Sequence, residues 1–161
     1  MDILRTALTV SLGLIAFAPS ADATPIDAAW DILHAVERGD GDSFMEMLSS
    51  SVRSQIEAAY AQFQEIARQN PQLAEELLQR TGSGIVPTDL EWMTLEDFVS
   101  GLLGSVRLPS LVDVVSESTS MSGRNAEVVF TWDSGFSMTF QLTWEDSAWR
   151  VTGSPVLERL F

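Results

Sequence analysis

The sequence predicts an α+β domain in which N-terminal helices pack on one face of a curved C-terminal antiparallel sheet of about four strands. Apolar residues recur at helical spacing up to about Pro109 and alternate with a period of two after it. A meander with one apolar face needs a cover, and the helical part is the segment that can supply it. We expect a signal peptide over 1–23 and a single α+β domain over 24–161, helical at 24–108 and a sheet at 109–161.

The first helix is expected to begin at Thr24-Pro25 and to end at Gly39. A threonine can cap the helix N-terminus, and proline suits its first turn because the missing N–H has no partner there. Glycine ends a helix because it adopts the left-handed conformation at little cost. Asp40 is then positioned to start a short second helix through Phe44.

The next helical segments are separated by serine, proline and glycine signals. We interpret 49–51 as a break, followed by a long helix over roughly 52–69. Asn70-Pro71 stops that helix and caps a shorter one, which ends at the loop 81–84. A further start signal, with Thr94 as the cap, opens the last helix of this part.

Four strands are expected after Pro109. The third has the clearest alternation, with apolar side chains on one face and hydroxyl or amide side chains on the other. Short turns rich in glycine, serine and acidic residues separate the strands. The strands are expected at about 111–121, 126–132, 136–144 and 149–152.

The N-terminal stretch from Met1 to about Ala23 has the pattern of a secretory signal peptide. Arg5 supplies positive charge, 6–18 is apolar and uncharged, and Ala21-Asp22-Ala23 matches the small-residue cleavage pattern. A spanning helix needs about 20 apolar residues, so a retained anchor is the weaker alternative and a buried N-terminal helix the weakest. Cleavage near Ala23 would place the domain in the periplasm or outside the cell, with no stable membrane span.

Composition restricts the classes of partner. The chain carries 23 acidic residues against 9 basic ones, for a formal net charge of −14, so nucleic acid and anionic membranes are disfavoured because they are also negative. The chain contains no cysteine, so it forms no disulfide and carries no lipid-modified cysteine. We expect neither a metal site nor a cofactor, since one histidine and scattered carboxylates form no ligand pattern.

Two segments resemble the nuclear transport factor 2-like superfamily, whose cone-shaped α+β fold is also similar to cystatin. The segment from Ala28-Ala29-Trp30 to Gly39-Asp40 resembles the opening helix and its exit. The segment from Leu142-Thr143-Trp144 to Trp149-Arg150-Val151 resembles the closing hairpin of exported members of unknown function. The resemblance implies a helix-covered sheet and a function among isomerases, dehydratases, lipid carriers and non-catalytic binding modules. Fold alone does not choose among them.

Three residues are candidate ligand-binding residues: His34, Tyr60 and Trp92. His34 is the single histidine and lies at the edge of the first helix's apolar stripe, where a partly buried, hydrogen-bonded structural role is the favoured interpretation. Tyr60 is the single tyrosine. Trp92 stands in a loop before a helix start, and tryptophan is enriched at contact surfaces. The other four tryptophans fall on apolar faces and are expected in the core.

The favoured functional hypothesis is a non-catalytic exported module that binds a small apolar ligand or lipid in a hydrophobic pocket between helices and sheet. The first alternative is a protein–protein interaction or homodimerisation module that uses the outer face of the sheet. The second is an isomerase or dehydratase, implied by the resemblance. That enzyme would use His34, Tyr60 and Asp113, although nothing in their spacing shows that they converge.

Overall fold

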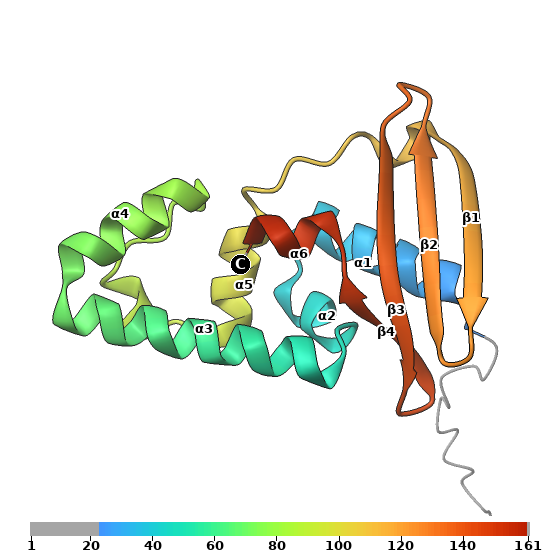
Figure 1. Ribbon diagram of the computed structural model, residues 1–161. Coiled ribbons are helices and arrows are strands. Elements are labelled where there is room, and N and C mark those ends of the chain that lie inside the picture. Colours follow the sequence, from blue (N-terminus) through green and yellow to red (C-terminus); the bar gives the residue numbers. More distant parts are fainter. Residues whose placement is uncertain (1–22, 161) are drawn as a thin grey trace, which may run out of the picture.

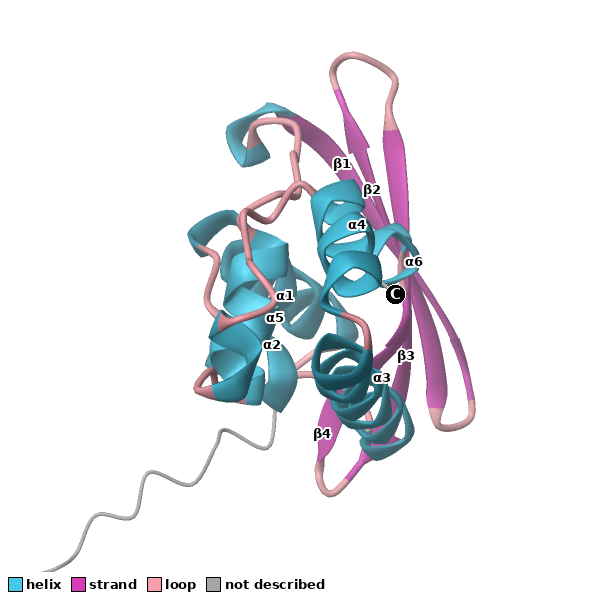
Figure 2. Ribbon diagram, turned by 90° about the vertical axis from the view of Figure 1, so that its left-hand side faces the viewer, coloured by secondary structure: helices cyan, strands magenta, loops and turns pink. Residues whose placement is uncertain are grey.

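A computed structural model describes residues 23–160 and confirms the predicted α+β architecture. Helices fill the N-terminal half of the chain, and four antiparallel strands form a curved sheet in the C-terminal half. Figure 1 shows the sheet on one side of the molecule, and Figure 2 shows the helices gathered on a single side of that sheet. The predicted signal peptide lies outside the described residues, apart from Ala23.

The first two helices begin and end where local capping signals predict. In α1 (Pro25–Arg38) the Thr24 hydroxyl accepts the amide of Asp27, whose carboxylate in turn accepts the Thr24 amide. Gly39 ends α1 in the left-handed conformation, at φ 64°. Asp40 then caps α2 (Gly41–Glu46) by accepting the Ser43 amide. Side-chain acceptors thus satisfy helix amides that have no partner within the helix.

The remaining helices of this half extend past the sheet. Helix α3 (Ser50–Gln69) leads away from it towards α4 (Pro71–Thr81), as Figure 1 shows. A loop with one turn of 3₁₀ helix, η1 (Asp89–Glu91), returns to α5 (Leu95–Leu103). None of the described helices is both long and apolar enough to cross a membrane.

The sheet is a meander in the order β1-β2-β3-β4, with every neighbouring pair antiparallel. Its strands are β1 (Val114–Ser122), β2 (Asn125–Trp132), β3 (Ser137–Glu145) and β4 (Ala148–Gly153). The face that packs against the helices is called the inner face, and the opposite one the outer face. Alternation in β2 places Ala126, Val128, Phe130 and Trp132 in the core, as expected.

Two apolar clusters hold the domain together. The larger one joins α1 and α2 to the inner face of the sheet through residues such as Leu33, Phe44 and Phe140, all at most 1 % exposed. The smaller one lies among the helices that extend past the sheet. Its buried members are Leu78, Ile85, Leu90, Phe98 and Leu102. The sheet-side cluster was expected, whereas the second core forms within the segment from α3 to α5, with Leu160 of the last helix packed against it.

Three predicted boundaries are wrong. Residues 111–113 form a 3₁₀ turn, η2 (Leu111–Asp113), because Leu111 is buried while Val112 is 89 % exposed, so β1 begins at Val114. The segment after β4 is a helix, α6 (Pro155–Leu160), capped by Ser154, so the sheet does not extend to 161. Ser49 is a cap rather than a break, and α3 starts at Ser50.

Candidate functional site

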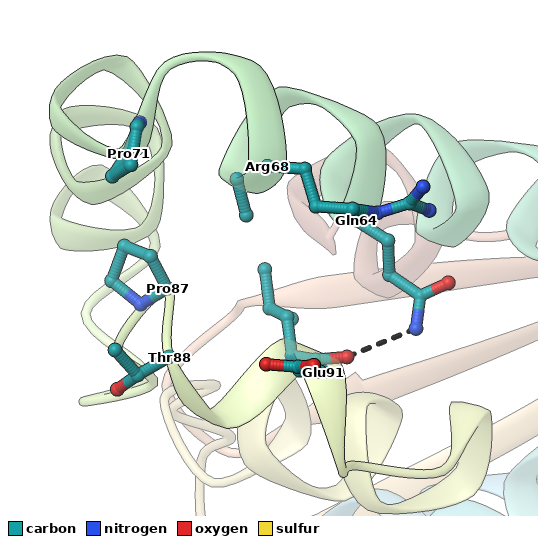
Figure 3. Close-up of a pocket in the computed structure, with 8 residues that line it drawn as sticks. Gln64, Arg68, Pro71, Pro87, Thr88 and Glu91 are labelled. Carbon is teal, nitrogen blue, oxygen red and sulfur yellow. Dashed lines mark hydrogen bonds between the residues drawn. The ribbon is translucent and has the colours of Figure 1, made fainter.

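A groove of about 480 Å³ lies between the C-terminal half of α3 and the loop that carries η1. Figure 3 shows its walls, with Pro71 and Pro87 on one side and Arg68 above Glu91 on the other. Its volume falls within the roughly 300–1,000 Å³ typical of small-molecule sites. The lining residues are Gln64, Ala67, Arg68, Pro71, Pro87, Thr88, Leu90 and Glu91.

Hydrogen bonds from α3 fix the loop that forms one wall of the groove. The Gln64 side-chain amide donates to the Leu90 carbonyl at 2.9 Å and to the Tyr60 hydroxyl at 3.0 Å. The Tyr60 hydroxyl in turn donates to the Met93 carbonyl. Figure 3 draws the bond from Gln64. These bonds attach the middle of η1, at Leu90, and the following loop residue Met93 to the helix, so the groove is preformed.

The groove combines an apolar interior with a polar rim. Ala67, Pro71, Pro87 and Leu90 supply the apolar surface, and the two prolines add rigidity because their φ angles are fixed. At the rim, the Arg68 guanidinium lies 3.1 Å from the Glu65 carboxylate, and both side chains are more than half exposed. An apolar ligand with one polar group suits this arrangement.

Exposed apolar side chains flank the groove. Among the described residues, Leu73 is 41 % exposed, Val86 45 % and Trp92 82 %. Each lies close in the sequence to a residue that lines the groove: Leu73 is two positions from Pro71, Val86 is next to Pro87, and Trp92 is next to Glu91. Large exposed apolar side chains next to a concave surface are typical of contact sites.

Two of the three predicted ligand-binding residues lie beside this groove. Tyr60 does not line it but holds its wall, packed against Phe98 with ring centroids 5.1 Å apart. Burial raises the pKa of Tyr60, with the charges of Asp97 and Glu96 acting in the same direction. Trp92 follows η1 directly, next to the lining residue Glu91 in the sequence, and is the most exposed tryptophan of the described residues.

His34, the third predicted residue, belongs to a different part of the surface. It stacks on Trp30 of the same helix, with ring centroids 5.8 Å apart, and its side chain is 48 % exposed. Its Nδ1 lies 3.6 Å from the Glu37 carboxylate, too far for a hydrogen bond. His34 therefore does not act together with Tyr60 and Trp92, and the expected hydrogen-bonded structural role is not what the structure shows.

The residues proposed for the enzymatic alternative are not brought together. Asp113 is exposed in η2, and neither it nor His34 lines the groove. Within residues 23–160, no group of three or more histidine or carboxylate side chains is placed to hold a metal ion. The arrangement at the groove offers shape and polarity for binding but no nucleophile paired with a base.

The expected pocket between helices and sheet is filled by side chains. The inner face of the sheet packs directly on α1 and α2, and Phe44, Phe130 and Trp132 at this interface are at most 1 % exposed. A smaller groove of about 320 Å³ lies at the margin of the sheet, between α3, the end of β4 and α6. Sequence reasoning missed the main groove's lining residues, although Asn70-Pro71 and Pro87 marked the turns that form it.

Comparisons with protein-family models, with curated proteins and with solved structures gave no match. The resemblance to the nuclear transport factor 2-like superfamily therefore rests on the two sequence segments and on the order of helices and strands.

Proposed function

We propose that this chain is an exported, non-catalytic binding module that holds a small apolar ligand or a lipid chain in the groove between α3 and η1. The observation that carries the proposal is the preformed wall, which Tyr60 and Gln64 hold in place without occupying the groove. Preorganisation favours binding because the loop loses little conformational entropy when a ligand enters.

The rim specifies the ligand further. Arg68, Thr88 and Glu91 surround an apolar interior, so the ligand is an apolar body that carries a polar or charged group at one end. Arg68 is the rim cation, and it suits an anionic head group such as a carboxylate or a sulfonate. Trp92 and Val86 would extend the apolar contact beyond the groove.

The test is a titration with anilinonaphthalene sulfonate, an apolar dye with an anionic group. Ala67→Trp fills the groove, and Thr88→Trp blocks it from an exposed position, so each variant should weaken dye binding by about tenfold or more. Ala61→Trp is the matched control, because Ala61 is an exposed residue of α3 that does not line the groove. Far-ultraviolet circular dichroism would verify that each variant is folded.

Equal dye affinity in all three variants and the parent chain would refute the groove as the binding site. Native mass spectrometry of the gently purified chain gives an independent readout. A bound small molecule that is lost in Thr88→Trp but kept in Ala61→Trp would support the proposal.

Edman sequencing of protein recovered outside the cytoplasm tests export, with Thr24 as the expected first residue.

Two broader proposals accompany this one. Distant membership of the nuclear transport factor 2-like superfamily is supported by helices followed by a four-stranded meander. Dimerisation through the outer face of the sheet has weaker support. That face is free of helices in Figure 2, but it presents polar side chains such as Ser118, Thr139 and Gln141, which lose water on association.

A further inference from the structure

The two edges of the sheet differ in how they are covered. Beside β4, the Val151 amide donates to the Met47 carbonyl at 2.9 Å, and the Val151 carbonyl accepts the Ser49 amide at 3.0 Å. The chain entering α3 thus closes that edge. Strand β1 is the outermost strand on the other side (Figure 1), and within residues 23–160 no segment pairs with its free edge.

The hydrogen-bond pattern shows which groups this edge presents. The Trp132 amide and the Arg124 carbonyl both bond towards the β3 side, at 2.9 and 2.7 Å. Even-numbered residues of β2 therefore bond to β3, and odd-numbered ones bond to β1. Given the register of β1 and β2, the N–H and C=O groups of Glu117, Thr119 and Met121 point away from the sheet.

The features that usually protect an edge strand are scarce in β1. It has nine residues and contains neither proline nor lysine, and its one irregularity is the register shift between Val114 and Ser116. Its single charge, Glu117, lies on the inner face, where the carboxylate accepts the Trp30 indole N–H at 2.7 Å. A long, nearly uncharged edge is a template for another strand.

We propose that the β1 edge pairs antiparallel with β1 of a second copy of this chain, around a two-fold axis at Thr119. Thr119 then lies opposite Thr119 of the second copy, and Glu117 opposite its Met121. The free backbone N–H and C=O groups of all three residues in each copy find partners, and two four-stranded sheets become one of eight strands. The serines of the outer face, at 116, 118, 120 and 122, meet one another without steric conflict.

Two side chains support this register. The Thr119 hydroxyl oxygen is buried and has no hydrogen-bond partner among residues 23–160, and a threonine directly opposite can supply one after a rotamer change. Met121 is 62 % exposed, and the methylene groups of Glu117 from the second copy would cover it. The strand is therefore complementary to itself in this arrangement.

Charge selects this register over its nearest alternative. With Thr119 on the axis, the two Glu117 residues are four positions apart along the strand, about 13 Å, which exceeds the screening length of about 8 Å at physiological salt. With Ser118 on the axis, they are two positions apart, about 7 Å, and repel each other. Because both copies are acidic overall, dimerisation should strengthen as salt is added.

Sedimentation equilibrium of the chain from Thr24 onwards tests the proposal, since this segment contains every helix, strand and core residue of the structure. Met121→Lys places a lysine opposite Glu117 of the second copy and should tighten the dimer about tenfold, because two symmetry-related pairs change together. Met121→Glu should weaken it by a similar factor. Combining Met121→Glu with Glu117→Lys should restore dimerisation.

The matched controls are Val112→Lys and Val112→Glu, which change net charge equally at an 89 % exposed position outside β1. Effects at Met121 that clearly exceed those at Val112, together with rescue in the double variant, would establish the pairing. A chain that stays monomeric up to millimolar concentration would overturn it. So would a dimer that responds identically to substitutions at both positions. Thr88→Trp, which blocks the groove, should leave the dimer unchanged.

Discussion

The stability of this protein in alkali should depend on one side chain, Tyr60. The chain has one tyrosine, no lysine and no cysteine, and arginine stays charged throughout the range concerned. Once the terminal amine has lost its proton, at a pKa near 8, Tyr60 is the side chain left to titrate between about pH 9.5 and 11.5. Any pH dependence of unfolding in this window therefore reports on Tyr60.

The direction of the effect follows from its surroundings. Burial raises the pKa of Tyr60 in the folded chain, and the nearby Asp97 and Glu96 carboxylates raise it further. The neutral hydroxyl also donates to the Met93 carbonyl, a bond that a phenolate cannot make. In the unfolded chain the tyrosine pKa is about 10. The contribution of Tyr60 to the free energy of unfolding is therefore complete below about pH 10, and it is lost as the pH rises towards the folded-state pKa.

Because only one proton is involved, the dependence of the free energy of unfolding on pH has an upper limit. The free energy of unfolding changes by at most about 1.4 kcal/mol per pH unit when the unfolded state binds one proton fewer than the folded state. Tyr60→Phe abolishes the slope, because phenylalanine does not ionise. It also costs about 1 kcal/mol at neutral pH, because the bonds to Met93 and Gln64 are lost.

Urea denaturation at half-unit pH steps, followed by tryptophan fluorescence, measures both quantities. The ultraviolet absorbance of the phenolate in the folded protein gives the folded-state pKa directly. The same alkaline decline in Tyr60→Phe and in the parent chain would refute the dependence on Tyr60. Formation of phenolate in the folded protein at an ordinary pKa near 10 would refute it as well.

Two further predictions concern backbone positions. Gly41→Ala should destabilise the fold by about 3 kcal/mol in urea denaturation, because a Cβ at Gly41 would lie 2.2 Å from the Glu96 carbonyl oxygen. In the control Gly104→Ala, the new Cβ would meet no atom closer than 3.4 Å, so the stability should change little. Ser147→Gly should raise the melting temperature, with a gain of up to about 1 kcal/mol, because Ser147 has a φ of 62° in the β3–β4 turn; an unchanged or lower melting temperature would contradict this.

The parts of the fold that the sequence predicts well are those set by neighbouring residues. Thr24, Asp40, Asn70 and Thr94 each accept an amide three positions on, so the helix starts depend on interactions within one turn. The buried alternation of β2 and β3 is likewise a local property of strands. Such signals are present in the residues themselves, whatever the rest of the chain does.

Short elements were mispredicted because packing decides them. Residues 111–115 are rich in valine, which favours strands, but the burial of Leu111 beside the hydrogen bond from the Trp132 indole to the Ser110 carbonyl turns the chain there. Helix α6 has six residues, too few for a periodic pattern, and it forms because Val156 and Leu157 are buried. In both places tertiary contacts outweigh local preference.

The candidate site could not be predicted from the sequence, because it also depends on contacts between distant residues. The roles of the single tyrosine and the loop tryptophan in ligand binding stay predictions, and the groove itself depends on pairing Gln64 with Leu90, a contact across 26 residues. The pocket expected against the sheet is absent from the interface because Phe130 and Trp132 fill the inner face. The main concave surface lies instead where α3 and α4 extend past the sheet. There they build their own small core, and the margin of that core is the groove.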